Sequence, residues 1–157
     1  MVSIGEQAPT PSMRLTDHET VNQEFDLKEA YSKGTVVLYF FPAAWTGVCT
    51  ESSCQIRDEI EEFKDLKVQM FGASNNMPFS HRRFIQDHNL NFPLLSDWNK
   101  EAITAFDIVD DDFANGLKGV SKRSLFVIKN GVLSYKWIAE HPGTYPPLAE
   151  LKAHLSK

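Results

Sequence analysis

Two cysteines, Cys49 and Cys54, are the residues of this chain best suited to covalent chemistry, and only four residues separate them. Thr46 precedes Cys49 by three residues and Pro42 precedes it by seven. A thiolate is a nucleophile, and a nearby hydroxyl can donate to it or to a polar substrate while its own oxygen accepts a hydrogen bond. No histidine stands at a metal-ligand spacing from either cysteine. The pattern therefore predicts sulfur nucleophile chemistry without a metal or another cofactor.

The residues around Cys49 predict where it lies in the fold. Residues 35–41 are apolar, β-branched and aromatic, and Gly34 and Pro42 bound them, which is typical of a central strand covered on both faces. The apolar residues of 49–66 recur at helical spacing, which predicts a helix that begins at Cys49. A cysteine at a helix start faces unpaired backbone N–H groups and the positive end of the helix dipole. Both features favour the thiolate.

A cation near the sulfur is also expected, because a helix terminus alone contributes only about 1 kcal/mol to the stability of an anion. Arg123 is the best candidate, since it directly precedes an apolar run at 124–129 that predicts a strand. The end of that strand could bring Arg123 back to the crevice that holds Cys49. A guanidinium stays charged and presents two forked donors to anionic or polar atoms.

The rest of the chain predicts alternating strands and helices that position these residues. Two prolines indicate an extended lead-in, and an Asn-Gly pair with two positive-φ positions predicts the turn of a hairpin. Ser96–Asp97 is a plausible cap for the helix that follows it. This order of elements predicts an α/β thioredoxin-like sandwich in a single domain, 1–157, although other mixed-sheet α/β folds would also accommodate it. The expected elements are an extended segment at 5–11, helices at 26–31, 79–89, 100–106 and 146–155, strands at 67–74 and 92–95, and the hairpin 124–129/132–138.

Composition narrows the classes of partner and compartment. Hydrophobic residues make up 42% and charged residues 24% of the 157 residues, and the formal net charge is -5. This is the balance of a globular protein, and it offers no footprint for nucleic acid or anionic lipid. The N-terminus has no pattern of a signal peptide and the longest apolar stretch is too short for a bilayer. We therefore expect a cytoplasmic location, where a cysteine pair more often means chemistry than stapling.

The motif Pro42-x-x-x-Thr46-x-x-Cys49 resembles the active-site motif of the peroxiredoxins. Arg123 and the strand after it resemble the arginine and the Ser/Thr-x-Phe-Val-Ile strand of the same family. The resemblance extends to Gly5-x-x-Ala8-Pro9, Gly72-Ala-Ser, His81-x-x-Phe84 and Phe92-Pro-Leu-Leu-Ser-Asp97, and so covers nearly the whole chain. The spacing of Cys49 and Cys54 resembles that of the bacterioferritin-comigratory-protein (peroxiredoxin Q) subfamily.

The resemblance implies a mechanism and a set of partners. The Cys49 thiolate would attack a hydroperoxide and become a sulfenic acid, while Thr46, Arg123 and the Cys49 backbone amide hold the peroxide. Cys54 would resolve the sulfenic acid as an intramolecular disulfide, which a thioredoxin-like dithiol protein reduces. In an intact helix, Cα atoms five residues apart are about 8.7 Å apart. A disulfide needs less than about 7 Å. The start of this helix must therefore unwind.

Several alternatives stay open at the level of the sequence. Cys54 could pack inward, leaving a one-cysteine peroxidase that an external thiol resolves. A thiol-disulfide oxidoreductase would normally use Cys-x-x-Cys, and a redox sensor or holdase chaperone would change partners rather than turn over peroxide. Ala43-Ala44-Trp45 and Val48 depart from the usual residues of the subfamily, so the preferred peroxide is open. The family contains both monomers and homodimers.

Overall fold

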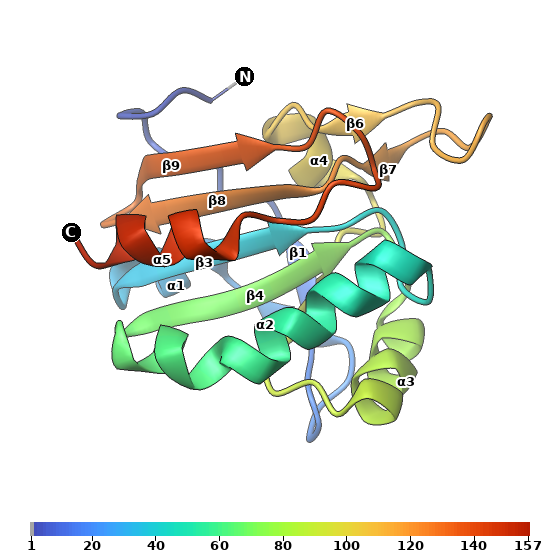
Figure 1. Ribbon diagram of the computed structural model, residues 1–157, viewed down its shortest axis with the longest axis horizontal. Helices are drawn as coiled ribbons and strands as arrows, with labels where there is room; N and C mark the ends of the chain where they lie inside the picture. The colour runs from blue at the N-terminus through green and yellow to red at the C-terminus, as the bar shows by residue number, and fades with distance from the viewer. Residues whose placement is uncertain (1) are drawn as a thin grey trace.

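A mixed seven-stranded sheet forms the centre of the molecule, which a computed structural model describes over residues 2–157. Strands β3, β4 and β5 run parallel, whereas β8 pairs antiparallel with β3 and β9 pairs antiparallel with β8 (Figure 1). In sheet order the strands are β2 (Gln23–Phe25), β1 (Met13–Thr16), β5 (Leu94–Ser96), β4 (Val68–Ser74), β3 (Thr35–Phe40), β8 (Ser124–Lys129) and β9 (Val132–Ile138).

Helices cover both faces of this sheet and give it two apolar cores. Helices α2 (Gly47–Asp65), α3 (Pro78–His88) and α5 (Leu148–Leu155) pack on one face. Helices α1 (Leu27–Ser32) and α4 (Glu101–Ala105) pack on the other. Figure 1 shows α2 and α5 in front of the strands. Alternate residues of β3 enter the two cores, so Val37 and Tyr39 face α2 while Val36 and Leu38 face away from it. This layering confirms the predicted thioredoxin-like sandwich.

The local signals of the sequence explain most element boundaries. The Asp26 carboxylate accepts hydrogen bonds from the Lys28 and Glu29 amides and so begins α1. The Asp97 carboxylate accepts from the Ala102 and Ile103 amides at 2.9 and 3.0 Å, as its place before α4 predicted. At the predicted hairpin turn, Asn130 and Gly131 have φ of 52° and 79°. Both values lie in the positive region that this turn requires.

Several short elements differ from the sequence-based prediction. Strands β1 and β2 and the small sheet of β6 (Val109–Asp110) and β7 (Val120–Ser121) were not predicted. None of these strands has more than four residues, which is too few to show a period in the sequence. The predicted strand 92–95 begins later, at Leu94, and the predicted helix 146–155 begins at Leu148. The long helix begins earlier than predicted, at Gly47.

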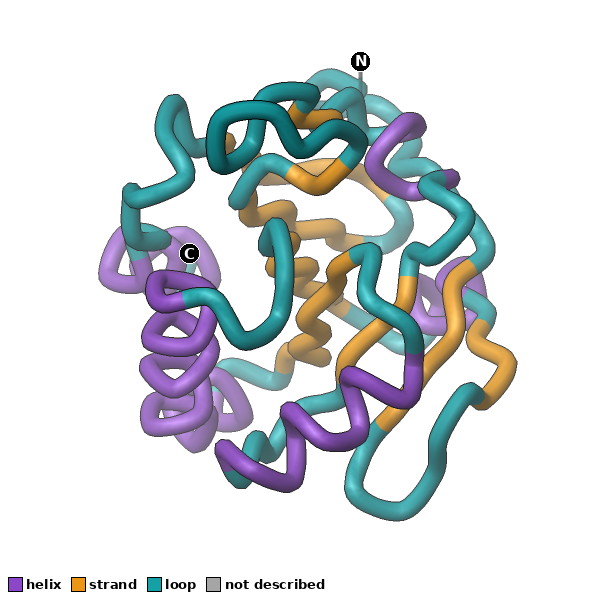
Figure 2. The backbone as a smooth tube through the Cα atoms, turned by 90° about the vertical axis from the view of Figure 1, so that its right-hand side faces the viewer, coloured by secondary structure: helices purple, strands orange, loops and turns teal. Residues whose placement is uncertain are grey.

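The carboxyl ends of β3 and β4 lie at one end of the molecule, and the N-terminus of α2 lies there too (Figure 1). Figure 2 looks onto this end, where loops make up most of the near surface. In an α/β sheet this is the edge at which sites form. Among the described residues, none of the helices combines the length and the apolar character that crossing a membrane requires.

Candidate active site

Cys49 lies in the first turn of α2, directly after the loop that leaves β3. Thr46 is the residue that caps this helix, and the first helical hydrogen bond runs from the Thr50 amide to the Thr46 carbonyl at 2.9 Å. The amides of residues 47–49 therefore precede the helical hydrogen-bond ladder and point out of the helix end. Cys49 is fully buried and reduced, so its sulfur lies in a protein environment rather than in water.

Arg123 supplies the cation that the sequence predicted beside this sulfur. Its Nη2 donates to the Cys49 Sγ over 3.3 Å, and only 2% of the Arg123 surface is exposed. β8 pairs with β3 so that Leu125 lies opposite Tyr39. Side chains alternate along a strand, so Arg123 points to the same face as Leu125, toward α2. The register of two strands therefore determines the contact between Arg123 and Cys49.

Two further groups fix the Arg123 guanidinium. Its Nη1 donates to the Tyr39 hydroxyl over 2.7 Å, and its Nε and Nη2 donate to the Pro142 carbonyl over 3.2 and 3.0 Å. Burial raises the pKa of Tyr39 to about 12, an effect that Arg123 opposes, so the hydroxyl is neutral. Burial lowers the pKa of Arg123, but its contacts with Tyr39 and Cys49 outweigh this effect and the net shift is upward. The guanidinium therefore stays charged inside the protein.

Thr46 lies at the predicted place but makes a different hydrogen bond. The sequence predicted that its hydroxyl donates to the thiolate or to a peroxide, whereas here Oγ1 donates to the Ala43 carbonyl over 2.9 Å. Trp45, with a φ of 75°, turns the chain so that the hydroxyl faces back toward this carbonyl. The Thr46 side chain makes no capping hydrogen bond to the helix. The Thr46 oxygen therefore remains an acceptor, and the hydroxyl leaves the Cys49 amide available.

Cys54 and Pro42 occupy different surroundings. Pro42 is buried in the loop after β3, where it presents no N–H. Cys54 is half-buried and reduced in the second turn of α2. Helix α2 is continuous from Gly47 to Asp65, so the two cysteines point about 140° apart around its axis. The intact helix keeps the two sulfurs apart.

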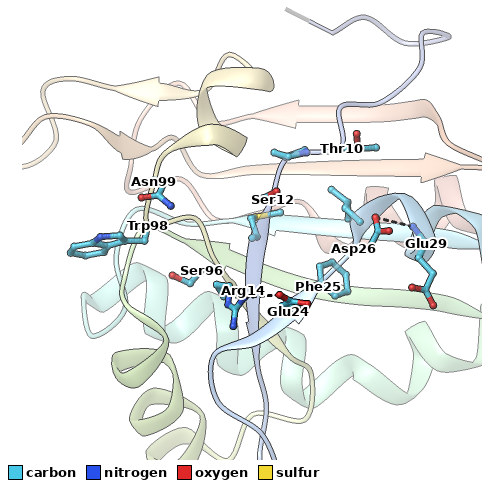
Figure 3. Close-up of a pocket in the computed structure, with 13 residues that line it drawn as sticks. Thr10, Ser12, Arg14, Glu24, Phe25, Asp26, Glu29, Ser96, Trp98 and Asn99 are labelled. Carbon is cyan, nitrogen blue, oxygen red and sulfur yellow. Dashed lines mark hydrogen bonds and ion pairs between the residues drawn. The ribbon is translucent and has the colours of Figure 1, made fainter.

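Several hollows lie on the surface of the described residues. One of about 310 Å³ adjoins the site, because Pro42, Arg123 and Pro142 contribute to its lining. Another of about 550 Å³ lies between β1, β2 and the segment after β5, and Figure 3 shows the Arg14–Glu24 ion pair in it, with Ser96 and then the Trp98 indole farther to the left. Neither cysteine lines this second hollow. Within residues 2–157, no cluster of three histidine, cysteine or acidic side chains is arranged to hold a metal ion.

Sequence reasoning missed Tyr39, Asn76 and the Pro142 carbonyl. Tyr39 lies within an apolar run, where its hydroxyl gave no separate signal. Asn76 follows β4 and accepts a hydrogen bond from the Ala44 amide at 2.8 Å. Pro142 lies in the loop after β9, far from Arg123 in the sequence. Only the pairing of β3 with β4 and β8, and of β8 with β9, could have brought these groups to the site.

A buried cysteine at a helix start, with an arginine on its sulfur and a thioredoxin-like sheet behind it, defines the class of thioredoxin-fold thiol peroxidases. The family described as AhpC/TSA matches residues 4–136. The chain belongs to this family of peroxiredoxins.

Individual relatives agree with this family. Peroxiredoxin Bcp of Bacillus subtilis (strain 168) is 32% identical over 138 residues, which are 87% of this chain and 85% of that protein. The chloroplastic peroxiredoxin Q of Oryza sativa subsp. japonica is 33% identical over 135 residues, which are 85% of this chain and 58% of that protein. The crystal structure of peroxidoxin BcpB from Mycobacterium tuberculosis superposes with a TM-score of 0.82 at 25% identity, covering 99% of this chain and 97% of that one.

Proposed function

We propose that the chain reduces hydroperoxides through Cys49 and forms a disulfide with Cys54. The contact between the Arg123 guanidinium and the Cys49 sulfur, buried together at 3.3 Å, carries this proposal. A positive charge beside the sulfur favours the thiolate, which is the form that attacks a peroxide. The bacterioferritin comigratory protein of Xanthomonas campestris, which has alkyl peroxide reduction activity, shares the fold with a TM-score of 0.78.

In the first step the Cys49 thiolate attacks the terminal oxygen of the hydroperoxide. The new S–O bond forms as the O–O bond breaks, which gives a sulfenic acid and an alkoxide or hydroxide that takes up a proton. Arg123 and the Cys49 amide would donate hydrogen bonds to the oxygens of the peroxide, while the Thr46 oxygen would accept a hydrogen bond from the peroxide O–H. Donors that already point at the developing charge lower the barrier without reorganisation.

In the second step the Cys54 thiol attacks the Cys49 sulfenic acid, which forms a disulfide and releases water. The intact α2 holds the two Cα atoms about 8.7 Å apart, beyond the reach of a disulfide, so its first turns must unwind. Local opening of this kind occurs at helix ends with few constraints. A thioredoxin-like dithiol protein would then reduce the disulfide. This step fits the proposal that the chain is a single-domain enzyme of the cytoplasm, where such reductants are present.

The test is to add one equivalent of hydrogen peroxide to the reduced protein and to measure the intact mass and the free thiols. We expect a loss of two hydrogens and of both thiols, and we expect Cys54→Ser to abolish the disulfide. One added oxygen at Cys49 with Cys54 still free would instead establish a one-cysteine peroxidase. Survival of both thiols would contradict the peroxidase mechanism and favour a sensor or chaperone.

A further inference from the structure

A chain of hydrogen bonds runs from a buried histidine to the loop between β3 and α2, the loop that contains Thr46. His81 on α3 lies 2.7 Å, through its Nε2, from the Ser74 hydroxyl at the end of β4. The Ser74 hydroxyl lies 2.8 Å from the Asn76 Oδ1, and this oxygen also accepts from the Ala44 amide over 2.8 Å. His81 and Ser74 are fully buried, and the mechanism proposed above uses none of these three side chains.

The chemistry of each group sets the direction of every hydrogen bond in the chain. The Ala44 N–H can only donate, so Asn76 must face it with its carbonyl oxygen. A carbonyl oxygen can only accept, so the Ser74 hydroxyl donates its proton to Asn76. The Ser74 oxygen then accepts from His81, which places the imidazole proton on Nε2. Burial lowers the pKa of His81 to about 3, which keeps the ring neutral.

The last link connects this chain to Thr46 through a single peptide group. The Ala44 N–H and the Ala43 C=O belong to the same planar amide. Asn76 binds the N–H of this amide, and the Thr46 hydroxyl donates to its C=O over 2.9 Å. Because the amide is rigid, fixing its N–H fixes the direction of its C=O. The Thr46 proton is then committed to Ala43, and the Thr46 oxygen is left to accept.

The loop needs such a restraint. Trp45, between this amide and Thr46, has a φ of 75°, which is unfavourable for a bulky side chain and costs about 1–3 kcal/mol. The Asn76 backbone is held in turn, because the Ser96 hydroxyl donates to the Asn76 carbonyl over 2.7 Å. Asn76, the end of this relay of His81, Ser74 and Asn76, is therefore anchored to β5 as well as to α3.

We infer that His81, Ser74 and Asn76 are positioning residues that orient the Thr46 hydroxyl through the Ala43–Ala44 peptide. This inference rests on the proposed function, in which the Thr46 oxygen accepts a hydrogen bond from the peroxide O–H. Asn76 is the member that touches the loop, so its side chain is the one to change.

Asn76→Leu removes the acceptor at similar volume. We expect the rate of Cys49 oxidation by hydrogen peroxide to fall about five- to tenfold, the effect of one lost oriented hydrogen bond. Alkylation of Cys49 by iodoacetamide, which needs no proton acceptor, should change less than about twofold. Asn75→Leu is the matched control, because the Asn75 amide donates to the Asp97 carbonyl and does not reach the loop.

A double-variant cycle separates this inference from the proposed function. Thr46→Val should lower the peroxide rate, and Asn76→Leu should cause no further loss in that background. If Thr46→Val leaves the peroxide rate unchanged, the proposed role of Thr46 is wrong. If Thr46→Val lowers the rate but Asn76→Leu does not, or if Asn76→Leu lowers alkylation equally, the relay does not act through Thr46 and the inference is overturned.

Discussion

Arg123 carries a permanent charge inside the protein, where a hydroxyl and a carbonyl satisfy its donors and hold one nitrogen on the Cys49 sulfur. A buried charge without such partners would cost several kcal/mol. The partners therefore serve stability and geometry together. At the scale of the residue, the rate of the site therefore depends on how many Arg123 N–H donors keep their direction toward Cys49, Tyr39 and Pro142.

Replacing Arg123 by lysine tests the geometry apart from the charge. Lysine keeps a positive charge but has one ammonium on a flexible stem, so it cannot bind Tyr39, Pro142 and Cys49 together. We expect the second-order rate of Cys49 oxidation to fall about 10²-fold, as when one oriented donor is removed. Stopped-flow tryptophan fluorescence measures this rate, and Arg57→Lys on α2 is the control. A full rate in Arg123→Lys would show that charge alone suffices.

Tyr39→Phe removes the hydroxyl that accepts from the Arg123 Nη1. The guanidinium then has one buried donor without a partner, which costs about 1–3 kcal/mol of folding free energy. Urea unfolding should show this loss, and the peroxide rate should fall about fivefold as the guanidinium gains freedom. Tyr31→Phe is the control, since the Tyr31 hydroxyl binds the Pro9 carbonyl away from the site. Equal stability of Tyr39→Phe and the parent would contradict this account.

The sequence predicted Cys49, Thr46 and Arg123 as neighbours because a motif and a strand start mark them. It could not predict the Thr46 hydrogen bond to Ala43, which depends on the positive φ of Trp45. Tyr39 was missed because its hydroxyl meets Arg123 only through the register of β3 with β8. Contacts between residues far apart in the sequence thus need the topology first.

At the scale of the element, helix α2 combines a stable body with a weak beginning. Its apolar face buries Ile56, Ile60 and Phe63 against the sheet. The Ser53 hydroxyl, by contrast, is buried without a hydrogen-bond partner. Unwinding of the first turns would let water reach this hydroxyl. The buried Ser53 hydroxyl therefore favours the opening that the disulfide requires.

Ser53→Ala removes one unpartnered hydroxyl and adds a better helix former. Together these changes stabilise the closed helix by about 1–2 kcal/mol. Disulfide formation with Cys54 should slow about five- to thirtyfold. Quenched-flow alkylation and intact mass measure this rate, and the slower resolution should raise overoxidation of Cys49 to the sulfinic acid. Gln55→Ala is the control for helix propensity; an unchanged disulfide rate in Ser53→Ala would exclude a contribution from its hydroxyl.

The length of an element explains whether the sequence predicted it. The long periodic helices α2 and α3 and the apolar strand β3 were predicted because each provides many residues with one pattern. Strands β1 and β2 exist because β1 pairs antiparallel with β5. Their pairing partners, rather than their own few residues, stabilise them, so a single short segment carries no signal.

At the scale of the whole molecule, the parallel connections from β3 to β4 and from β4 to β5 bring the carboxyl ends of β3 and β4 to one edge of the sheet. There the loop after β3 contacts Asn76, which follows β4. α3 packs beside this edge and buries His81. The neutral imidazole of His81 therefore contributes both to the folding free energy and to the hydrogen bonds that hold the loop after β3.

This coupling predicts an acid dependence of stability. Burial lowers the pKa of His81 to about 3 from an ordinary value of 6.5. Since the unfolded chain binds the proton first, the contribution of His81 to stability is complete above about pH 6.5 and is lost as the pH falls toward 3. Between pH 7 and pH 5 the loss is about 2 kcal/mol, from 1.36 kcal/mol per pH unit below 6.5.

Urea unfolding at the two pH values, in the parent and in His81→Gln, measures the contribution of His81 to the free energy of unfolding. Glutamine keeps an N–H donor for Ser74 but does not titrate in this range, so the variant should lose about 2 kcal/mol less than the parent between pH 7 and pH 5. Other titrating groups, including His154, act equally in both proteins and cancel in the difference. Equal losses in parent and variant would mean that His81 takes up its proton inside the folded protein near its ordinary pKa.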